Sequence, residues 1–382
     1  MPAVAFKPRQ WRTFPLNHPN GFDFIMPKVH NFSSGPAILP REVMEAGSRA
    51  CLEFNGMGLS ILEISHRSKE FEGVLDQAVS LVKELLAVPS GYSVLFLQGG
   101  ASLQFAQIPM NLLDQDATAA YLDTGTWATK AIKEAKAFGN VKVVASSKES
   151  NYTFIPKQYD VPKDAVYLHV TSNNTIFGTQ MQRFPAVDMP LVADMSSDIF
   201  SRPVDVAKFG LIYAGAQKNM GIAGTTLVIV RDDMLGKVKR SLPTMLDYRV
   251  HAKDGSMHNT PPVFPIYMAM ETLAWLKRGG GITAMQKRNE DKARKLYTEI
   301  DANPLFKGTC AIEDRSLMNV TFVMEKPELE EAFLKECKAA NLSGLKGHRS
   351  VGGFRASIYN AMEMDAIDAV VSVMQNFTKR NA

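Results

Sequence analysis

The sequence has few cysteines, no long apolar run and almost no excess of charge. The three cysteines, Cys51, Cys310 and Cys337, form no CxxC pair and no cluster with histidine, so the sequence indicates neither a disulfide framework nor a zinc site. No apolar stretch reaches the roughly 18 residues that a membrane-spanning helix needs. The formal net charge is +4 and the basic residues are scattered, which argues against a nucleic-acid partner. We therefore predict a cytoplasmic protein with no metal, membrane or nucleic acid among its partners.

Two common nucleotide-binding motifs are also missing. The sequence contains neither a GxGxxG fingerprint nor a Walker motif, which argues against dinucleotide and nucleoside-triphosphate enzymes. The chain does have length and apolar content: 382 residues, of which 46% are hydrophobic and 21% charged. This composition is typical of a globular protein. The length exceeds what a single core usually serves, so we expect two domains.

The first 30 residues differ from the rest of the chain. They contain five prolines and four basic residues against one acid, Asp23. The basic bias resembles that of a transit peptide, but the prolines oppose an amphipathic helix and serine is absent. We interpret residues 1–30 as a loosely ordered extension.

Beyond residue 30, short β-rich runs alternate with helical patterns. Strands are expected at 92–97, 119–122, 141–145, 166–170, 191–193, 211–214 and 225–230. Strand–helix alternation with few hairpin signals predicts an α/β fold with a mostly parallel sheet. Gly279-Gly280-Gly281 precedes a further α/β region. We therefore expect a large domain over 31–280 and a smaller C-terminal α/β domain over 281–382.

An acid and a lysine follow two of the expected strands. Leu191-Val192-Ala193 ends in Asp194, and the run from Phe209 ends in small residues before Gln217-Lys218-Asn219. Pyridoxal phosphate (PLP) needs such a pair: a lysine amine for the Schiff base, and an acid that keeps the pyridine nitrogen protonated. A surface lysine and a solvated strand-end acid are the alternative on these residues alone.

Two further features lie where a cofactor would bind. Gly99-Gly100-Ala101-Ser102 occupies a strand-to-helix junction, where backbone N–H groups and the helix dipole can hold a phosphate. Trp127 follows another strand and offers a flat ring for stacking. An ordinary βα turn and a tryptophan packed at a helix start explain the same residues, and the sequence leaves both interpretations open.

Arginines and histidines gather in two short segments. His66-Arg67 precedes Ser68 at a helix start, and His348-Arg349 lies in a glycine-rich stretch that leads to Arg355. Arginine forks match carboxylate and phosphate geometry, so these residues indicate a doubly anionic substrate. Asn259-Thr260-Pro261-Pro262 reads as a stiff turn, and the residues alone do not assign it a role.

From about Asn31 onward the chain resembles the phosphoserine aminotransferases, which are class V, fold-type I PLP enzymes. The matching motifs are 32–37 (FSSGPA), 64–71 (ISHRSKEF), 214–219 (AGAQKN), 259–262 (NTPP), 346–349 (KGHR) and 355–361 (RASIYNA). Together they span about nine-tenths of the chain, and only the first 30 residues lie outside them.

The resemblance implies a role for each residue of the site. Lys218 would form the Schiff base and move the substrate proton, with Asp194 at the pyridine nitrogen. The other cofactor residues would be Trp127 on the ring, Thr175 at the phenolic oxygen, and Ala101, Ser102 and Gln217 at the phosphate, joined by Asn259 and Thr260 from a partner subunit of a homodimer. The substrate anions would meet His66, His348, Arg349, Arg355 and the partner's Arg67. Some members carry an arginine where this chain has Ser102, so either the other basic residues contribute more to binding the substrate phosphate or the affinity falls.

The resemblance predicts a reaction of L-serine biosynthesis. 3-Phosphohydroxypyruvate and L-glutamate would give O-phospho-L-serine and 2-oxoglutarate, and in many bacteria the family also aminates a phosphorylated hydroxythreonine precursor of vitamin B6. The alternatives within the fold are an alanine–glyoxylate-type aminotransferase and a cysteine desulfurase. The latter needs a cysteine on a mobile loop, whereas Cys337 lies in a helical pattern. A non-catalytic α/β binding protein is the alternative of another class.

Overall fold

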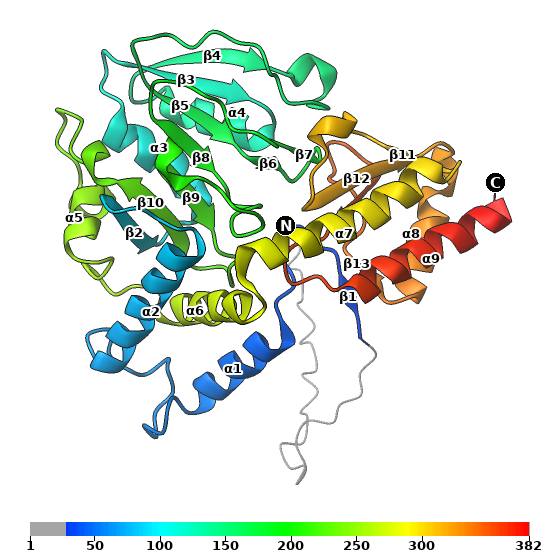
Figure 1. Cartoon of the computed structure of the whole chain (residues 1–382), viewed down its shortest axis with the longest axis horizontal. Coiled ribbons are helices and arrows are strands. Elements are labelled where there is room, and N and C mark those ends of the chain that lie inside the picture. The colour runs from blue at the N-terminus through cyan, green and yellow to red at the C-terminus, as the bar shows by residue number, and fades with distance from the viewer. Residues whose placement is uncertain (1–27, 382) are drawn as a thin grey trace, which may run out of the picture.

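The computed structural model describes residues 28–381. The prediction of a loosely ordered segment over 1–30 falls almost entirely outside these residues. The central sheet has seven strands in the order β2-β10-β9-β8-β5-β3-β4 (Figure 1). They are β2 (Tyr92–Leu97), β3 (Thr118–Asp123), β4 (Asn140–Ser146), β5 (Ala165–Thr171), β8 (Leu191–Asp194), β9 (Phe209–Gly215) and β10 (Thr226–Arg231). Only the pairs that β10 makes in this sheet are antiparallel, so the prediction of a mostly parallel sheet is confirmed.

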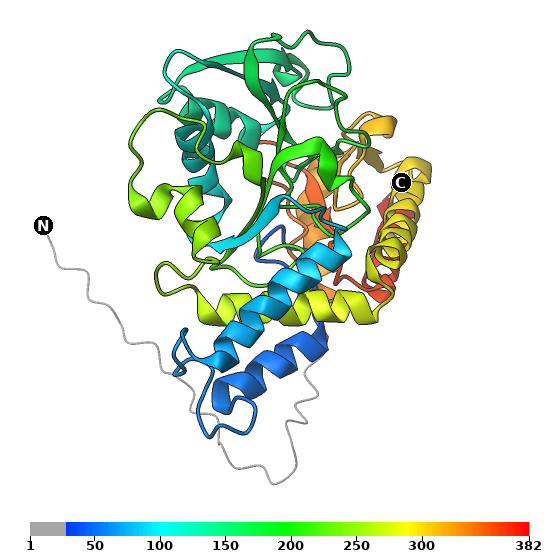
Figure 2. The ribbon, with the colours of Figure 1, turned by 60° about the vertical axis from the view of Figure 1, so that its left-hand side comes forward.

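Period-two alternation along the strands supplies both faces of this sheet with apolar side chains. In β9, Leu211 and Tyr213 pack into one core, whereas Ile212 and Ala214 pack into the other. The first core is covered by α3 (Gly100–Leu112), α4 (Thr126–Ala135) and α5 (Tyr248–Lys253). The second is covered by α1 (Arg41–Leu52), α2 (Lys69–Leu85) and α6 (Val263–Arg278), which lie side by side in both views (Figure 1, Figure 2).

Helix α2 forms where the sequence places it. The Ser68 hydroxyl accepts a hydrogen bond from the Phe71 N–H at 3.3 Å and caps the helix. Its buried residues, among them Phe71, Leu75 and Val82, recur with helical spacing and face the sheet and α6.

A second, antiparallel sheet has the order β11-β12-β14 and its own apolar core. Its strands are β11 (Phe306–Gly308), β12 (Asn319–Met324) and β14 (Phe354–Ser357), and α7 (Gly281–Ala302), α8 (Glu330–Ala339) and α9 (Met364–Asn381) pack against it. Two short pairs complete the strands: β1 (His30–Asn31) with β13 (Leu342–Ser343), and β6 (Asn173–Asn174) with β7 (Thr179–Gln180).

Helix α7 contributes to two cores, the one under α1, α2 and α6 and the one of the second sheet. Ile282 and Met285 pack with α1, α2 and α6, whereas Leu296 and Ile300 pack with the second sheet. Phe32, near the start of the described chain, belongs to the core of the β11-β12-β14 sheet as well. The division into domains 31–280 and 281–382 therefore stays a prediction. Among residues 28–381, none of the helices combines the length and apolar character that a bilayer span needs.

Candidate active site

A cavity of about 320 Å³ opens where the parallel strands β5, β8 and β9 end. Carboxyl ends of parallel strands meet at one edge of a sheet, which is where α/β proteins place their ligands. The cavity is lined by Ser34, Gly35, Pro36, Gly100, Ala101, Ser102, Phe105, Trp127, Thr171, Asn173, Thr175, Asp194, Ser196, Ser197, Gln217, Lys218 and Ala223. Its volume lies within the range of roughly 300–1,000 Å³ that is usual for small-ligand sites.

Asp194 is the last residue of β8 and is only 6% exposed. The backbone N–H of Ser196 donates to its Oδ1 at 2.9 Å. Burial raises the pKa of Asp194, while the contacts with Ser196 and the positive charge of Lys218 oppose that rise. A buried carboxylate facing a cavity is suited to a cationic group of a ligand.

Lys218 faces the same cavity from the turn after β9. Burial lowers the pKa of its amine, the charge of Asp194 raises it, and the charge of Arg355 lowers it further. The Ala37 N–H donates to the Gln217 carbonyl at 2.9 Å, which ties segment 34–37 to the lysine turn. A lysine with a lowered pKa is a better nucleophile at neutral pH, since more of it is unprotonated.

Trp127 lies in the first turn of α4 and lines the cavity beside Lys218. The Lys218 Nζ lies 5.9 Å from the centroid of its ring. The indole Nε1–H donates to the Thr175 Oγ1 at 3.1 Å, which fixes the plane of the ring. Trp127 and Thr175 therefore form one wall of the cavity.

The glycine turn before α3 presents the start of that helix to the cavity. Gly99 has a φ of +89°, and a Cβ built there would lie 2.4 Å from the Leu103 Cδ2, so the turn requires glycine. Ala101 and Ser102 follow in the first turn and line the cavity. That turn, which the structure describes in full, contains no acidic residue. Its N–H groups and dipole therefore favour an anion.

Arg355 lies beside the cavity on β14. Its two Nη groups donate to the Thr175 carbonyl at 3.0 Å and to the Ser34 Oγ at 2.8 Å. Its buried Nε has no hydrogen-bond partner within residues 28–381, and burial lowers the pKa of the guanidinium. A half-buried guanidinium with unused donor capacity is suited to receive a carboxylate or phosphate.

Further cations lie near Arg355. Burial lowers the pKa of His348, and the charges of Arg355, Arg349 and Lys130 add to that shift. The Lys130 Nζ lies 4.6 Å from the centroid of the Trp127 ring. These groups give the region a positive charge. Lys130 was not predicted from the sequence to be one of them.

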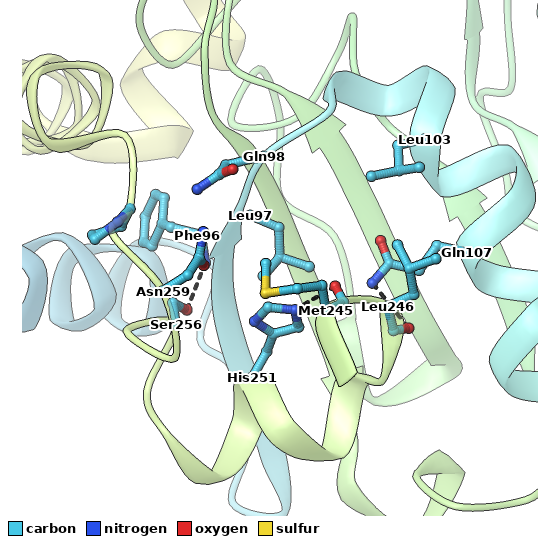
Figure 3. Close-up of a pocket in the computed structure, with 11 residues that line it drawn as sticks. Phe96, Leu97, Gln98, Leu103, Gln107, Met245, Leu246, His251, Ser256 and Asn259 are labelled. Carbon is cyan, nitrogen blue, oxygen red and sulfur yellow. Dashed lines mark hydrogen bonds between the residues drawn. The ribbon is translucent and has the colours of Figure 1, made fainter. Parts of the chain in front are cut away.

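Several of the predicted site residues lie elsewhere in this chain. Of the described residues that line the cavity, none is His66, Arg67, Asn259 or Thr260. Asn259 instead lines a separate hollow of about 230 Å³ with Gln98 and His251 (Figure 3), and the Gln98 amide donates to the Thr260 carbonyl at 2.9 Å. The structure therefore gathers Ala101, Ser102, Trp127, Thr175, Asp194, Gln217 and Lys218 around one cavity, with Arg355 and His348 nearby.

Several cavity residues were not predicted from the sequence, among them Ser34, Asn173, Ser196 and Ser197. Ser196 had a readable signal: a residue two positions after a strand-end aspartate commonly donates its backbone N–H to that carboxylate. The other three gave no such signal, because their places depend on loops that return from distant parts of the chain.

The cavity residues fit PLP. An amine and a buried carboxylate face one space, an indole ring forms a wall, and a helix start offers N–H groups for a phosphate. The cysteines do not fit a desulfurase: burial raises the pKa of Cys337 to about 12 and also raises that of Cys310. Neither they nor Cys51 is among the described residues that line the cavity.

Comparison with known proteins gives the family of the chain. The model of the family "Aminotransferase class-V" matches residues 29–370. The phosphoserine aminotransferase of Flavobacterium johnsoniae is 60% identical over 349 residues, which are 91% of this chain and 98% of that protein. The one from Bacteroides fragilis is 58% identical and covers 92% of this chain and 99% of its own length.

Solved structures of phosphoserine aminotransferases also match this chain. The phosphoserine aminotransferase of Bacillus circulans subsp. alkalophilus superposes with a TM-score of 0.91 at 47% identity, covering 93% of this chain and 99% of that one. The PLP-bound enzyme of Trichomonas vaginalis gives 0.87 at 40% identity and covers 91% and 100%. The chain therefore belongs to the class V aminotransferases, within their phosphoserine aminotransferase family.

Proposed function

We propose that the cavity around Lys218 is the active site of a phosphoserine aminotransferase of L-serine biosynthesis. The reaction converts 3-phosphohydroxypyruvate and L-glutamate into O-phospho-L-serine and 2-oxoglutarate. One observation carries the assignment of the site: Lys218 and the buried Asp194 face a single cavity with Trp127 as a wall. A phosphorylated hydroxythreonine, the vitamin B6 precursor, is a second substrate under the same proposal.

The cofactor is PLP, which when bound supplies an aldehyde that carries the amino group and a ring that withdraws electrons. Lys218 would hold it covalently, and Asp194 would keep a proton on its ring nitrogen. Trp127 would stack on the ring and Thr175 would bond the phenolic oxygen. The phosphate would be held by Ala101, Ser102 and Gln217 of one chain, and by Asn259 and Thr260 of a second copy.

Lys218 has the properties of the group that moves the substrate proton. Because burial lowers the pKa of its amine, a larger share of it is neutral near pH 7 and can accept a proton from the substrate α carbon. Asp194 is only 6% exposed, so water screens its charge little and the charge acts strongly on a neighbouring cation.

Substrate binding would use the cations around Arg355. Its guanidinium is already oriented by Thr175 and Ser34, so it would take the substrate carboxylate at little entropic cost. His348, Arg349 and His66 would add donors for the phosphate, together with Arg67 from a second copy of the chain. Cytoplasmic location is part of the same proposal, because the reaction belongs to central amino-acid synthesis.

Substrate selectivity is the direct test. The purified protein should use O-phosphoserine at least 100-fold better than serine in kcat/KM, because serine lacks the phosphate and so loses charge-assisted hydrogen bonds worth on the order of 1.5–3 kcal/mol each. Arg355→Lys, which keeps the charge and loses the fork, should raise the KM for both phosphoserine and glutamate on the order of tenfold.

Arg278→Ala is the matched control, because this exposed arginine pairs with Glu42 on the surface and should leave both constants unchanged. Equal turnover of serine and phosphoserine would overturn the proposal and favour another class V aminotransferase.

A further inference from the structure

One face of the central sheet carries buried polar side chains beside Asp194. Asp194 on β8 is paired in register with Thr171 on β5 and with Tyr213 on β9. Residues paired in neighbouring strands point to the same face of a sheet, and His169, two positions before Thr171, shares that face. Tyr213 and His169 are 0% and 2% exposed. The reaction proposed above uses neither of them.

These two side chains contact each other. The His169 Nε2 lies 2.9 Å from the Tyr213 hydroxyl oxygen, and the His169 ring stacks on Tyr121 with the centroids 4.8 Å apart. Burial raises the pKa of Tyr213 well above its ordinary value, and the charge of Asp194 adds to that rise. Burial lowers the pKa of His169 to about 3. Tyr213 is therefore a protonated phenol at neutral pH, and His169 a neutral imidazole.

The surroundings of the imidazole determine which nitrogen carries its proton. The buried Nδ1 of His169 has no hydrogen-bond partner within residues 28–381. A buried N–H without a partner is rarer than a buried acceptor without one, so the proton belongs on Nε2, which then donates to the Tyr213 oxygen. The Tyr213 O–H is left to donate elsewhere, and Asp194 is the charged neighbour in register.

The Asp194 carboxylate has room for a further donor. Its Oδ1 accepts from the Ser196 N–H at 2.9 Å and the Ser196 side chain also stabilises its charge, which leaves other lone pairs of its two oxygens free. A buried carboxylate is costly unless donors stabilise its charge. Hydrogen bonds to a charged group are the strong ones.

We propose that Tyr213 and His169 are positioning residues for the reaction, and that they act through Asp194. The His169 Nε2–H directs the Tyr213 hydroxyl, and this hydroxyl holds the Asp194 carboxylate ionised and fixed in direction. The inference rests on the proposed function, because only there does Asp194 face the ring nitrogen of the cofactor.

The test compares the binding of two cofactors to the apoenzyme. One is PLP, and the other is an analogue in which carbon replaces the ring nitrogen. Wild type should prefer PLP, and Tyr213→Phe should reduce that preference on the order of tenfold, the size of one hydrogen bond to a charged group. The kcat of Tyr213→Phe should fall by a similar factor while the KM for phosphoserine stays unchanged, since no substrate contact is lost.

Three variants separate positioning from packing. Tyr167→Phe removes an equally buried hydroxyl from the same face, one bonded to Tyr121 at 2.8 Å, and should keep the wild-type preference. His169→Gln keeps a donor near the Nε2 position and should keep most of the preference, whereas His169→Leu should lose it as Tyr213→Phe does. Thermal unfolding of each apoenzyme confirms that the variants are folded.

The outcomes distinguish the inference from the function on which it rests. A full preference for PLP in folded Tyr213→Phe would overturn the inference alone, and so would an equal loss in Tyr213→Phe and Tyr167→Phe. No preference in wild type would overturn the role of Asp194 in the proposed function itself.

Discussion

At the scale of single residues, burial shifts the pKa values of the site's two reactive groups in opposite directions. It raises the pKa of Asp194 and lowers that of Lys218, so both shifts favour the neutral form. Each group also opposes the other's shift through its charge. The charge of Lys218 therefore helps to keep Asp194 ionised, whereas the charge of Asp194 limits how much of the Lys218 amine burial makes neutral.

Burial of His169 predicts a specific dependence of stability on pH. Its pKa falls from 6.5 to about 3 in the folded chain, so between these values the unfolded chain binds a proton that the folded chain does not. The stability that the folded chain gains with a neutral His169 is fully present above pH 6.5 and is lost as the pH falls toward 3. The free energy of unfolding of apo His169→Gln should therefore fall less steeply than that of wild type between about pH 6 and pH 4, by about 1.4 kcal/mol per pH unit.

Urea unfolding of both apoenzymes across this pH range measures the difference. Parallel slopes for the two proteins would contradict the account, because they would mean that His169 titrates alike in the folded and unfolded chains.

At the scale of elements, the turn before α3 and the interior of α2 place opposite demands on glycine. Gly99 has a positive φ and no room for a Cβ, whereas Gly73 lies inside α2 with nothing within 4 Å of a built Cβ. Gly99→Ala should destabilise the apoenzyme by about 1–3 kcal/mol through backbone strain and should also weaken PLP binding. Gly73→Ala, the matched control, should stabilise it by about 0.5–1 kcal/mol.

Urea unfolding and fluorescence titration with PLP check both variants. If the two substitutions changed stability in the same direction, the left-handed turn would not be the feature that positions α3.

The elements themselves were largely predictable, because their signals are local. The helix start predicted at Ser68 is the start of α2, and β2 runs over the predicted residues Tyr92–Leu97. The contacts between elements were not predictable. Arg355 donates to the Thr175 carbonyl 180 positions away, and a period of two gives the face of a residue without its distant neighbour. For the same reason the sequence predicted Asp194 but gave no role to Tyr213 or His169.

At the scale of the whole molecule, one chain does not bring all the predicted residues together. Asn259, Thr260 and Arg67 are absent from the described lining of the Lys218 cavity, and Asn259 lines a different hollow (Figure 3). This arrangement supports the proposal of a homodimer in which a twofold axis lets each chain lend these residues to the other.

Mixing two inactive variants tests this sharing. Lys218→Ala lacks the reactive amine, and Asn259→Ala/Thr260→Ala lacks the lent phosphate contacts. In a mixed dimer one site has an intact lysine and intact lent residues, so random assortment should restore about a quarter of the sites. Co-refolding followed by an activity assay measures the recovery. Confirmed mixed dimers without activity would place Asn259 and Thr260 in their own chain's site or away from the cofactor.

The central claim is that Lys218 holds the cofactor in the cavity that it shares with Asp194. Borohydride reduction of the purified holoenzyme, followed by digestion and mass spectrometry, would identify the lysine that carries the pyridoxyl phosphate. The account predicts one labelled peptide, the one that contains Lys218, and no label in Lys218→Ala. A label on Lys130, which lies over the same Trp127 ring, or on Lys208 would contradict it.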